Sequence, residues 1–495
     1  MTRRALLPVL VFALAVVVYG QYGFDGELRR DHAIYLYSGQ RMAEGIPPYV
    51  SIFDHKGPLA PMLAGLGVMI SEQLGWDDIY TVRAVFFVVG CVAVVSVYAL
   101  GNGLFRSRRV GAFAALTFLG FFGFAQYAAS GPEPKVPMVL FQVLSLLLTS
   151  RRRWFWAGVC GSLSFLVWLP MAIFPLVTLF LATVQPRRGR TTAMVLALAG
   201  IGLPLVAVSA YFWYHDAFGK LLDGSILFNV FYGDREEQSV LSHFLAPVRV
   251  ALHGYGTAFL PILVGFAMIV YLLFSRTVRH GSLGNVLKGD ALAPVLLTFP
   301  VVVLWSLLDF QWYPDLYVFL PYVAVGFGRF LDLVVRRAEG SEKPALPGGV
   351  GRLLTLGLCA FLVVLAAVNA LAGINDRLRS GFAAQKRATA QIEERFGRDA
   401  KLVSIGVPQV LVLSHRSNPN PHAFIGAGID QYIHANTPGG FEGWLRELQE
   451  YDPDVIAFGK TKGVHKQELM SWLRSRYHEE RVGPWRLFVK NTLDK

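Results

Sequence analysis

Long apolar runs separated by short charged segments dominate the first three quarters of the chain. A transmembrane helix needs roughly 20 mostly apolar residues, and many of these runs approach that length. Eleven candidates lie near residues 5–22, 80–104, 110–128, 135–150, 154–168, 170–184, 192–214, 249–275, 291–307, 316–334 and 353–372. The pattern therefore predicts a polytopic α-helical membrane protein.

A shorter apolar stretch, residues 58–72, contains Pro58 and Pro61. Cytoplasmic loops carry an excess of Lys and Arg. If this stretch stays on the outer face of the membrane, all the arginine clusters between spans lie on the cytoplasmic side. If it crosses the membrane, the clusters at 106–109 and 151–153 lie on the outer side. We therefore predict about eleven spans in a multi-pass protein of the plasma membrane, with its N-terminus in the cytoplasm. The first run lacks a small-x-small cleavage site at Gly20-Gln21-Tyr22, so it is predicted to remain as a span.

The composition supports this prediction. Of the 495 residues, 54% are hydrophobic and only 16% are charged, with a mean hydropathy of +0.45; soluble proteins carry roughly 25% charged residues. The net charge of +12 follows from the cytoplasmic arginines and does not indicate nucleic-acid binding. The three cysteines, at 91, 160 and 359, lie inside apolar runs without metal-ligand spacing, which argues against thiol or zinc chemistry.

The last part of the chain has a different pattern. Residues 376–400 are polar and helix-prone, and beyond them the β-like runs KLVSI, DVIAF and WRLFV alternate with helical ones such as FEGWLRELQEY. We predict a membrane domain over 1–375 with its first outer loop at 23–57, a helical linker over 376–400 and an extracytoplasmic α/β domain over 401–495.

Ionisable side chains gather in the first outer loop. Asp31, His32, Asp54, His55 and Lys56 all lie at the predicted membrane boundary. Charged groups there are costly unless they are hydrated or paired. The cluster indicates either a polar cavity or a loop that is simply solvated.

Three further outer loops add candidates. Glu133 lies in a proline-rich turn, where it either caps the following helix or faces a shared site; paired with Asp31, it would suit general-base chemistry or a divalent cation. The third loop offers Asn229, Tyr232 and Asp234 as sugar contacts, while Phe228 and Phe231 are predicted to be interfacial. The fourth loop contributes four boundary residues: Asp309, Trp312, Tyr313 and Asp315. Its two aromatic residues are predicted belt residues, and Tyr313 is also a candidate for substrate binding.

The strings Asp31-His32-Ala33-x-Tyr35, Gly45-x-x-Pro48-Tyr49 and Phe53-Asp54-His55-Lys56-Gly57-Pro58 resemble the first outer loop of GT-C glycosyltransferases. The subgroup is that of the dolichyl-phosphate-mannose protein mannosyltransferases and aminoarabinose transferases. The resemblance extends to the spans, the acidic turn at Glu133, the QWYPDLYVFLP run and the α/β tail.

This resemblance implies transfer of a sugar from a polyprenyl-phosphate donor, with inversion, to a glycan, lipid or protein acceptor at the outer face. It implies Asp31 as the catalytic base, Glu133 as a second acidic residue and Lys56 as the contact to the donor phosphate. Many relatives have Asp-Glu where this chain has Asp31-His32, so His32 is not assigned as an acid.

The residue types fit this chemistry independently. A carboxylate takes the proton of the attacking hydroxyl, and a cation stabilises the departing phosphate. His55 assists at the phosphate, and Asp54 holds Lys56. Two rival interpretations remain: a transporter or flippase of lipid-linked glycans, and a non-catalytic glycan-binding membrane protein. Transporters place ionisable residues near the middle of their spans, whereas here the acidic residues gather at one face.

Overall fold

The computed structural model describes residues 6–186, 188–233, 240–308, 310, 313–340, 349–378, 381–426 and 428–491. They form two compact units, each built from segments far apart in the sequence. The first unit joins Met1–Gly23, Ala84–Ala207 and Gln238–Leu378, and the second joins Phe24–Arg83, Val208–Glu237 and Arg379–Lys495. Two of the boundaries between them fall inside long helices, α4 (Asp78–Phe105) and α10 (Arg190–Tyr214).

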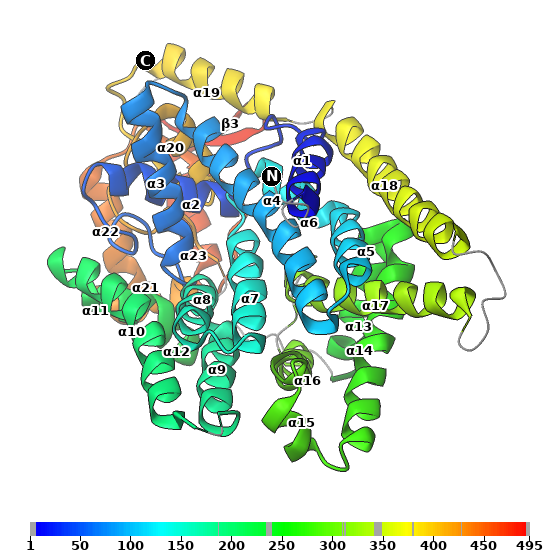
Figure 1. Cartoon of the computed structure of the whole chain (residues 1–495). Helices are drawn as coiled ribbons and strands as arrows, with labels where there is room; N and C mark the ends of the chain where they lie inside the picture. Colours follow the sequence, from blue (N-terminus) through cyan, green and yellow to red (C-terminus); the bar gives the residue numbers. More distant parts are fainter. Residues whose placement is uncertain are drawn as a thin grey trace. The chain divides into compact units, whose positions relative to one another are not determined.

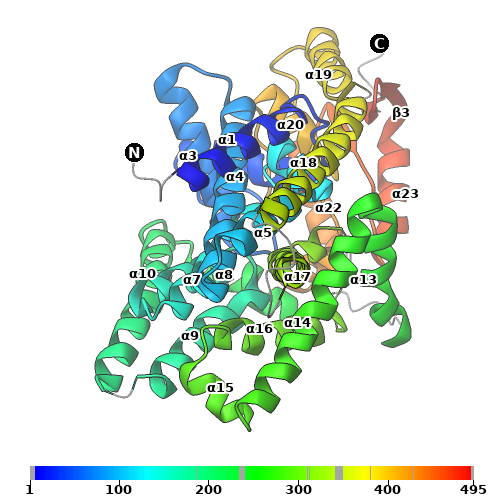
Figure 2. The same cartoon turned by 45° about the vertical axis from the view of Figure 1, so that its right-hand side comes forward.

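All the regular secondary structure among the described residues of the first unit is helical (Figures 1 and 2). Besides most of α4 and α10, it contains α1 (Leu6–Gly20), α5 (Arg108–Leu119), α6 (Phe122–Ser130), α7 (Lys135–Ser150), α8 (Trp154–Val167), η1 (Leu169–Ala172), α9 (Ile173–Val184), α13 (Val240–Tyr255), η3 (Gly256–Ala258), α14 (Phe259–Arg279), α15 (Leu283–Gly289), α16 (Ala293–Ser306), η4 (Tyr313–Val318), α17 (Leu320–Glu339) and α18 (Gly349–Leu378).

The membrane character of the chain is confirmed. The lengths and bends of several apolar helices differ from those of the predicted runs. Among the described residues, four helical segments are long and apolar enough to cross a bilayer: Asp78–Phe105, Arg190–Tyr214, Gly256–Arg279 and Gly349–Leu371. The run expected at 110–128 bends by 66° between α5 and α6, and six other apolar helices have 10–17 residues. The total of eleven spans stays a prediction.

Close backbone packing joins the helices of the first unit. A Cβ atom at Gly265 of α14 or at Gly326 of α17 would collide with the backbone of the other helix. Small residues of this kind let membrane helices approach without a large apolar side chain between them. By contrast, α18 exposes large apolar side chains, which suit contact with lipid: Leu353, Leu356, Phe361, Val364, Val368 and Leu371.

The second unit combines the first predicted outer loop, part of the third and the tail of the chain. Its helices are α2 (Arg30–Ala43), α3 (Leu59–Leu74), α11 (Phe218–Leu222), η2 (Asp223–Leu227), α12 (Phe228–Phe231), α19 (Phe382–Phe396), α20 (Pro408–Ser414), α21 (Ile429–Asn436), α22 (Gly440–Tyr451) and α23 (Lys466–Arg476). Its strands are β1 (Leu402–Ile405), β2 (Val455–Phe458), β3 (Tyr477–Val482) and β4 (Trp485–Lys490).

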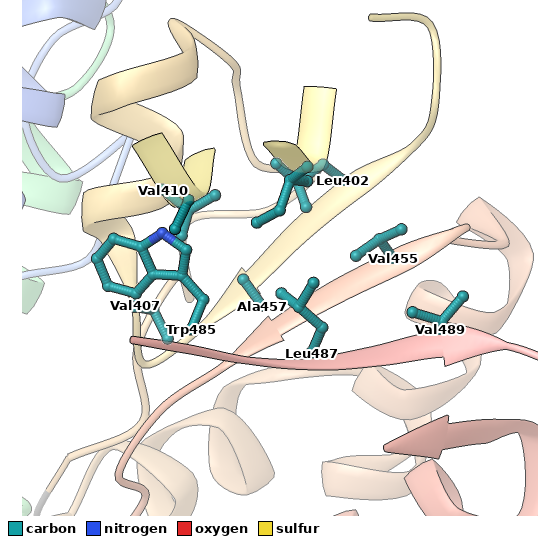
Figure 3. Close-up of a cluster of buried hydrophobic side chains, with 10 residues drawn as sticks. Leu402, Val407, Val410, Val455, Ala457, Trp485, Leu487 and Val489 are labelled. Carbon is teal, nitrogen blue, oxygen red and sulfur yellow. The ribbon is translucent and has the colours of Figure 1, made fainter. Parts of the chain in front are cut away.

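The four strands form one sheet in the order β1-β2-β4-β3. β1 and β2 are parallel, with Leu402 opposite Val455, whereas β4 is antiparallel to both of its neighbours. Apolar side chains of β1, β2 and β4 form a buried cluster with residues of α19 and α20 (Figure 3). The indole of Trp485 belongs to this cluster, and its Nε1–H donates to the hydroxyl of Thr389 on α19 at 3.1 Å.

α2 packs against α3 through small residues. A Cβ atom at Gly39 of α2 would lie 2.8 Å from the backbone nitrogen of Gly65 and 2.9 Å from the carbonyl carbon of Ala64. Only a glycine therefore allows this approach without a shift of the backbone. The contact fixes α2, which carries the first candidate residues, beside α3.

The segment before α2 is held by α19 of the tail. The side chain of Gln385 accepts from the Leu28 backbone N–H at 3.0 Å and donates to the Leu28 carbonyl at 3.1 Å. The buried guanidinium of Arg83 donates to the carbonyls of Phe24 and Gly26 and lies 4.6 Å from the ring centre of Phe382. These contacts fix where α2 begins.

Candidate functional site

Asp31 lies in the first turn of α2. A carboxylate is favoured there because the first turn of a helix presents unpaired N–H groups and the positive end of the helix dipole. Its Oδ2 lies 3.4 Å from Nζ of Lys56, and its Oδ1 lies 3.5 Å from Nε of Arg30. The Asp31 side chain is 49% exposed, so the carboxylate is paired and still open to a ligand.

Lys56 lies in the irregular segment before α3. Its Nζ lies 5.5 Å from the ring centre of Tyr35, which is one helical turn after Asp31 and therefore on the same face of α2. The hydroxyl of the buried Tyr49 donates to the Lys56 carbonyl at 2.5 Å. The structure thus brings Asp31, Tyr35 and Lys56 together.

Each charged group of this pair stabilises the ionised form of the other. The ammonium of Lys56 lowers the pKa of Asp31 well below its ordinary value, against the effect of burial and with smaller help from Arg30 and His32. Burial disfavours the charge on Lys56, but Asp31, Tyr35 and Asp54 together outweigh it and raise the pKa of Lys56 well above its ordinary value. Both groups are therefore charged at neutral pH.

The remaining first-loop residues support the backbone around Lys56. Asp54 is buried, and its Oδ1 accepts from the His55 backbone N–H at 2.8 Å. The His55 carbonyl accepts from Nδ2 of Asn229 at 2.7 Å. His32 is buried beside Asp31. Asp54 therefore interacts electrostatically with Lys56. Asn229 contacts the loop through its side-chain amide.

The aromatic residues of the third loop differ from the prediction. Phe228, expected at the membrane interface, is only 2% exposed; its ring packs edge-on against Phe53 at 5.2 Å and lies 5.6 Å from His55. Tyr232 stacks on Phe228 at 6.0 Å. Phe231 is exposed, as an interfacial residue would be. Phe228 was mispredicted because an aromatic residue of an outer loop is typical of the membrane interface, and the sequence does not reveal its packing against a distant segment.

The C-terminal tail contributes to this aromatic cluster, which the sequence did not indicate. Tyr432 of α21 lies 4.6 Å from Phe53 and 5.5 Å from Tyr232, measured between ring centres. His422 lies 5.8 Å from Phe53. Burial, with a smaller contribution from the charge of Lys220, lowers the pKa of His422 to about 4. His422 is therefore a neutral ring beside the Lys56 loop at physiological pH.

Glu133 and Tyr313 belong to the first unit. Glu133 is buried, and its Oε1 accepts from the Lys135 backbone N–H at 3.3 Å, at the start of α7. This contact pairs one free N–H group at the start of α7, as the capping alternative predicts, although the N-cap residue itself is Pro134. Tyr313 stacks against Tyr255 at 6.2 Å. The pairing of Glu133 with Asp31 stays a prediction, as do the sugar contacts of Asn229, Tyr232 and Tyr313.

A second ion pair lies close to Glu133 in the sequence. Lys135 pairs with the buried carboxylate of Asp315, and its Nζ lies 4.2 Å from the ring centre of Trp168. Lys135 was not predicted as a site residue, although its place in the same proline-rich turn as Glu133 was a visible signal. Asp234, Asp309 and Trp312 lie outside the described residues. Among the residues that the structure describes, no group of three or more His, Cys, Asp or Glu side chains is placed to hold a metal ion.

Comparisons with known proteins identify the fold. No protein-family model matches the chain, and no curated protein matches it either. Two solved structures of ArnT from Cupriavidus metallidurans do match, each with 15% sequence identity, and the alignment covers 98% of this chain and 97% of that one. The TM-score is 0.65 for the apo structure and 0.63 for the structure bound to undecaprenyl phosphate.

The match extends over nearly the whole chain, including both the apolar helices and the tail. The predicted resemblance to the GT-C and aminoarabinose transferase group is therefore confirmed for the fold. The chain therefore has the same fold as these two structures.

Proposed function

We propose that the chain is a GT-C glycosyltransferase that uses a polyprenyl-phosphate sugar at the extracytoplasmic face of the plasma membrane. The observation that carries this proposal is the contact between Asp31 and Lys56 at 3.4 Å. A half-exposed carboxylate beside a lysine is the minimum needed to activate a hydroxyl and hold a phosphate. A match of the whole fold to a structure bound to undecaprenyl phosphate supports this donor class.

The reaction is a single displacement at the anomeric carbon. The acceptor hydroxyl, on a glycan, lipid or protein, attacks C1 of the donor sugar while Asp31 takes its proton. The bond between C1 and the phosphate oxygen breaks, and polyprenyl phosphate leaves as an anion. Lys56 stabilises the charge that develops on this oxygen. Because attack and departure occur on opposite sides of C1, the configuration inverts.

The ion pair has a consequence for this mechanism. While Lys56 contacts Asp31, the low pKa of Asp31 makes it a weak base. A donor phosphate competes for the Lys56 ammonium, and as Lys56 turns toward the phosphate the proton affinity of Asp31 rises. Donor binding would thus activate the base. Glu133, at the start of α7, is proposed as the supporting acidic residue.

The substitution Asp31→Asn tests the proposal. The full-length protein in nanodiscs is incubated with undecaprenyl-phosphate sugars and acceptor-containing membrane extract, and release of undecaprenyl phosphate is followed by mass spectrometry. We expect turnover to fall by about 100-fold or more, the scale of a lost general base, while donor binding is retained.

The matched control is Asp399→Asn, at an exposed position after α19, which should keep full turnover. Retained turnover in Asp31→Asn would show that Asp31 is not the base. Specific donor binding by the wild type without turnover of any donor would favour the non-catalytic interpretation.

A further inference from the structure

Helices α11, η2 and α12 follow one another without a break and form one helical segment, residues 218–231. One face of this segment packs against the Lys56 loop, residues 53–57. Nδ2 of Asn229 donates to the His55 carbonyl at 2.7 Å. A Cβ atom at Gly224 would lie 2.6 Å from another carbonyl oxygen of this loop, so the two backbones are in contact. The segment therefore supports the backbone that carries Lys56.

The opposite face of the segment is apolar and exposed. In its C-terminal half, residues 224–231, every exposed position holds a large apolar side chain. These side chains are between 43% and 72% exposed: Ile226, Leu227, Val230 and Phe231. A helix that lies on a protein surface in water carries polar residues on its outer face. A continuous apolar face of this kind indicates a partner other than water.

The segment begins close to the end of a membrane helix. α10 is long and apolar enough to cross a bilayer, and it ends at Tyr214, three residues before residue 218 is reached. The end of α10, from Val208, belongs to the same unit as the segment. Its last two side chains, those of Trp213 and Tyr214, are exposed, and exposed Trp and Tyr at the end of a span are typical of the level of the lipid headgroups. The apolar face therefore starts at the depth where the hydrocarbon of the bilayer begins.

The Lys56 loop contacts the end of the same membrane helix. The ring of Phe212 of α10 lies 5.7 Å from that of Tyr49, and the Tyr49 hydroxyl donates to the Lys56 carbonyl. The loop is thus held on one side by the end of α10 and on another by segment 218–231. Both supports border the membrane.

Lipid is the partner that fits these features. The exposed face is continuous with a membrane span, and between residues 224 and 231 it contains no charged or polar side chain that burial in hydrocarbon would penalise. A helix with one apolar face and one face bound to protein lies along the interface of a bilayer.

We propose that the exposed face of segment 218–231 lies in the extracytoplasmic leaflet of the bilayer and thereby fixes the Lys56 loop at the level of the lipid phosphates. The benefit to donor binding rests on the proposed function, in which Lys56 contacts the donor phosphate. The depth of the segment and the order of the loop do not depend on it, so they are measured without turnover.

Spin labelling tests the depth of the segment. In full-length protein without its three native cysteines, a nitroxide is attached to Val230→Cys or to Val464→Cys, and the protein is reconstituted in nanodiscs. Val464 is the matched control, an exposed valine of the same unit before α23. Power saturation compares the access of oxygen, which dissolves in lipid, with that of a water-soluble nickel complex.

The label at 230 should be more accessible to oxygen than to nickel, and the label at 464 should show the reverse. Equal nickel access at both positions would place the apolar face in water and overturn the proposal. Low access of both reagents at 230 would mean that protein, such as a second copy of the chain, covers this face, and would overturn the lipid partner.

The double variant Val230→Ser/Phe231→Ser tests the support of the loop. In water, serine at exposed positions changes stability little, whereas in lipid each serine gives up apolar transfer free energy. We expect amide hydrogen exchange over residues 53–57 to become faster by about 3-fold or more. Val464→Ser should leave this exchange unchanged. Identical exchange over 53–57 in the double variant and the wild type would show that the segment does not fix the loop.

Discussion

The ion pair between Asp31 and Lys56 puts the proposed base in contact with the proposed phosphate-binding cation. Their charges stabilise each other, and this stabilisation lowers the pKa of Asp31. In the absence of donor, Asp31 is therefore deprotonated at neutral pH. The acidic limb of kcat/KM, which reports the ionisation of the free enzyme, should lie below the range in which aspartate normally titrates.

Removal of the Lys56 charge should move this limb. In Lys56→Met the pKa of Asp31 rises, because the largest effect that lowers it is lost while burial remains. The acidic limb should then shift upward by about 1 to 3 pH units, and kcat/KM at neutral pH should fall by about 100-fold. A pH profile of initial rates measures both effects.

Lys56→Arg is the matched control, because it keeps a positive charge beside Asp31. It should retain an acidic limb close to that of the wild type. An identical limb in wild type and Lys56→Met would contradict the proposed coupling of the two charges.

The composition of the candidate site was partly visible in the sequence. Asp31 and Tyr35 are spaced by one helical turn, and Lys56 follows in the same loop, so their proximity follows from a short segment. The burial of Phe228 and the contribution of Tyr432 could not be predicted, because both arise from packing between segments about 200 residues apart. The cap at α7 was one of two alternatives for Glu133, and the sequence could not choose between them.

Helix α19 connects the tail to the start of α2. Its residue Gln385 satisfies both backbone groups of Leu28, three residues before Asp31. Because Leu28 is fully buried, these backbone groups have no access to water if the amide is lost. The position of Asp31 thus depends on a helix more than 350 residues away in the sequence.

Replacement of Gln385 by leucine should loosen this connection. Gln385→Leu leaves two buried backbone groups unpaired, at a cost of about 1 to 3 kcal/mol each at most. We expect faster amide hydrogen exchange over residues 26–31 and a lower kcat/KM. The control is Gln391→Leu, an exposed position of the same helix. Unchanged exchange at residues 26–31 in Gln385→Leu would contradict this role.

Several elements agree with the sequence pattern, and the exceptions have physical causes. The runs KLVSI, DVIAF and WRLFV coincide with strands β1, β2 and β4 to within one residue at an end, and the alternation or continuous burial of such strands gives a clear signal. β3 was missed because its sequence, YHEERV, is mostly polar and it lies at the edge of the sheet. The run at 110–128 is interrupted at Gly120, between α5 and α6, which apolar composition alone does not reveal.

The assembly of the chain into two units was not predicted. Hydropathy divides the sequence into consecutive blocks, whereas each unit joins three segments that are distant in the sequence. Such pairings depend on complementary surfaces, and no local pattern records them. The apolar spans themselves were predictable because the bilayer imposes their length.

The orientation of the chain in the membrane can be tested by cysteine labelling. In a background without Cys91, Cys160 and Cys359, Trp76→Cys should react with a membrane-impermeant maleimide on intact cells, because residue 76 is predicted to lie outside. Arg188→Cys, in a predicted cytoplasmic loop, should react only after permeabilisation. Both positions are exposed. Labelling of residue 76 only after permeabilisation would refute the predicted topology.

Native mass spectrometry of the purified protein, released from nanodiscs made with its own membrane lipids, tests the proposed donor most directly. The wild type and Asp31→Asn should both carry a polyprenyl-phosphoryl sugar, whereas Lys56→Met should carry much less. If only bulk phospholipids are found, in equal amounts with all three proteins, the chain does not bind the donor that we propose.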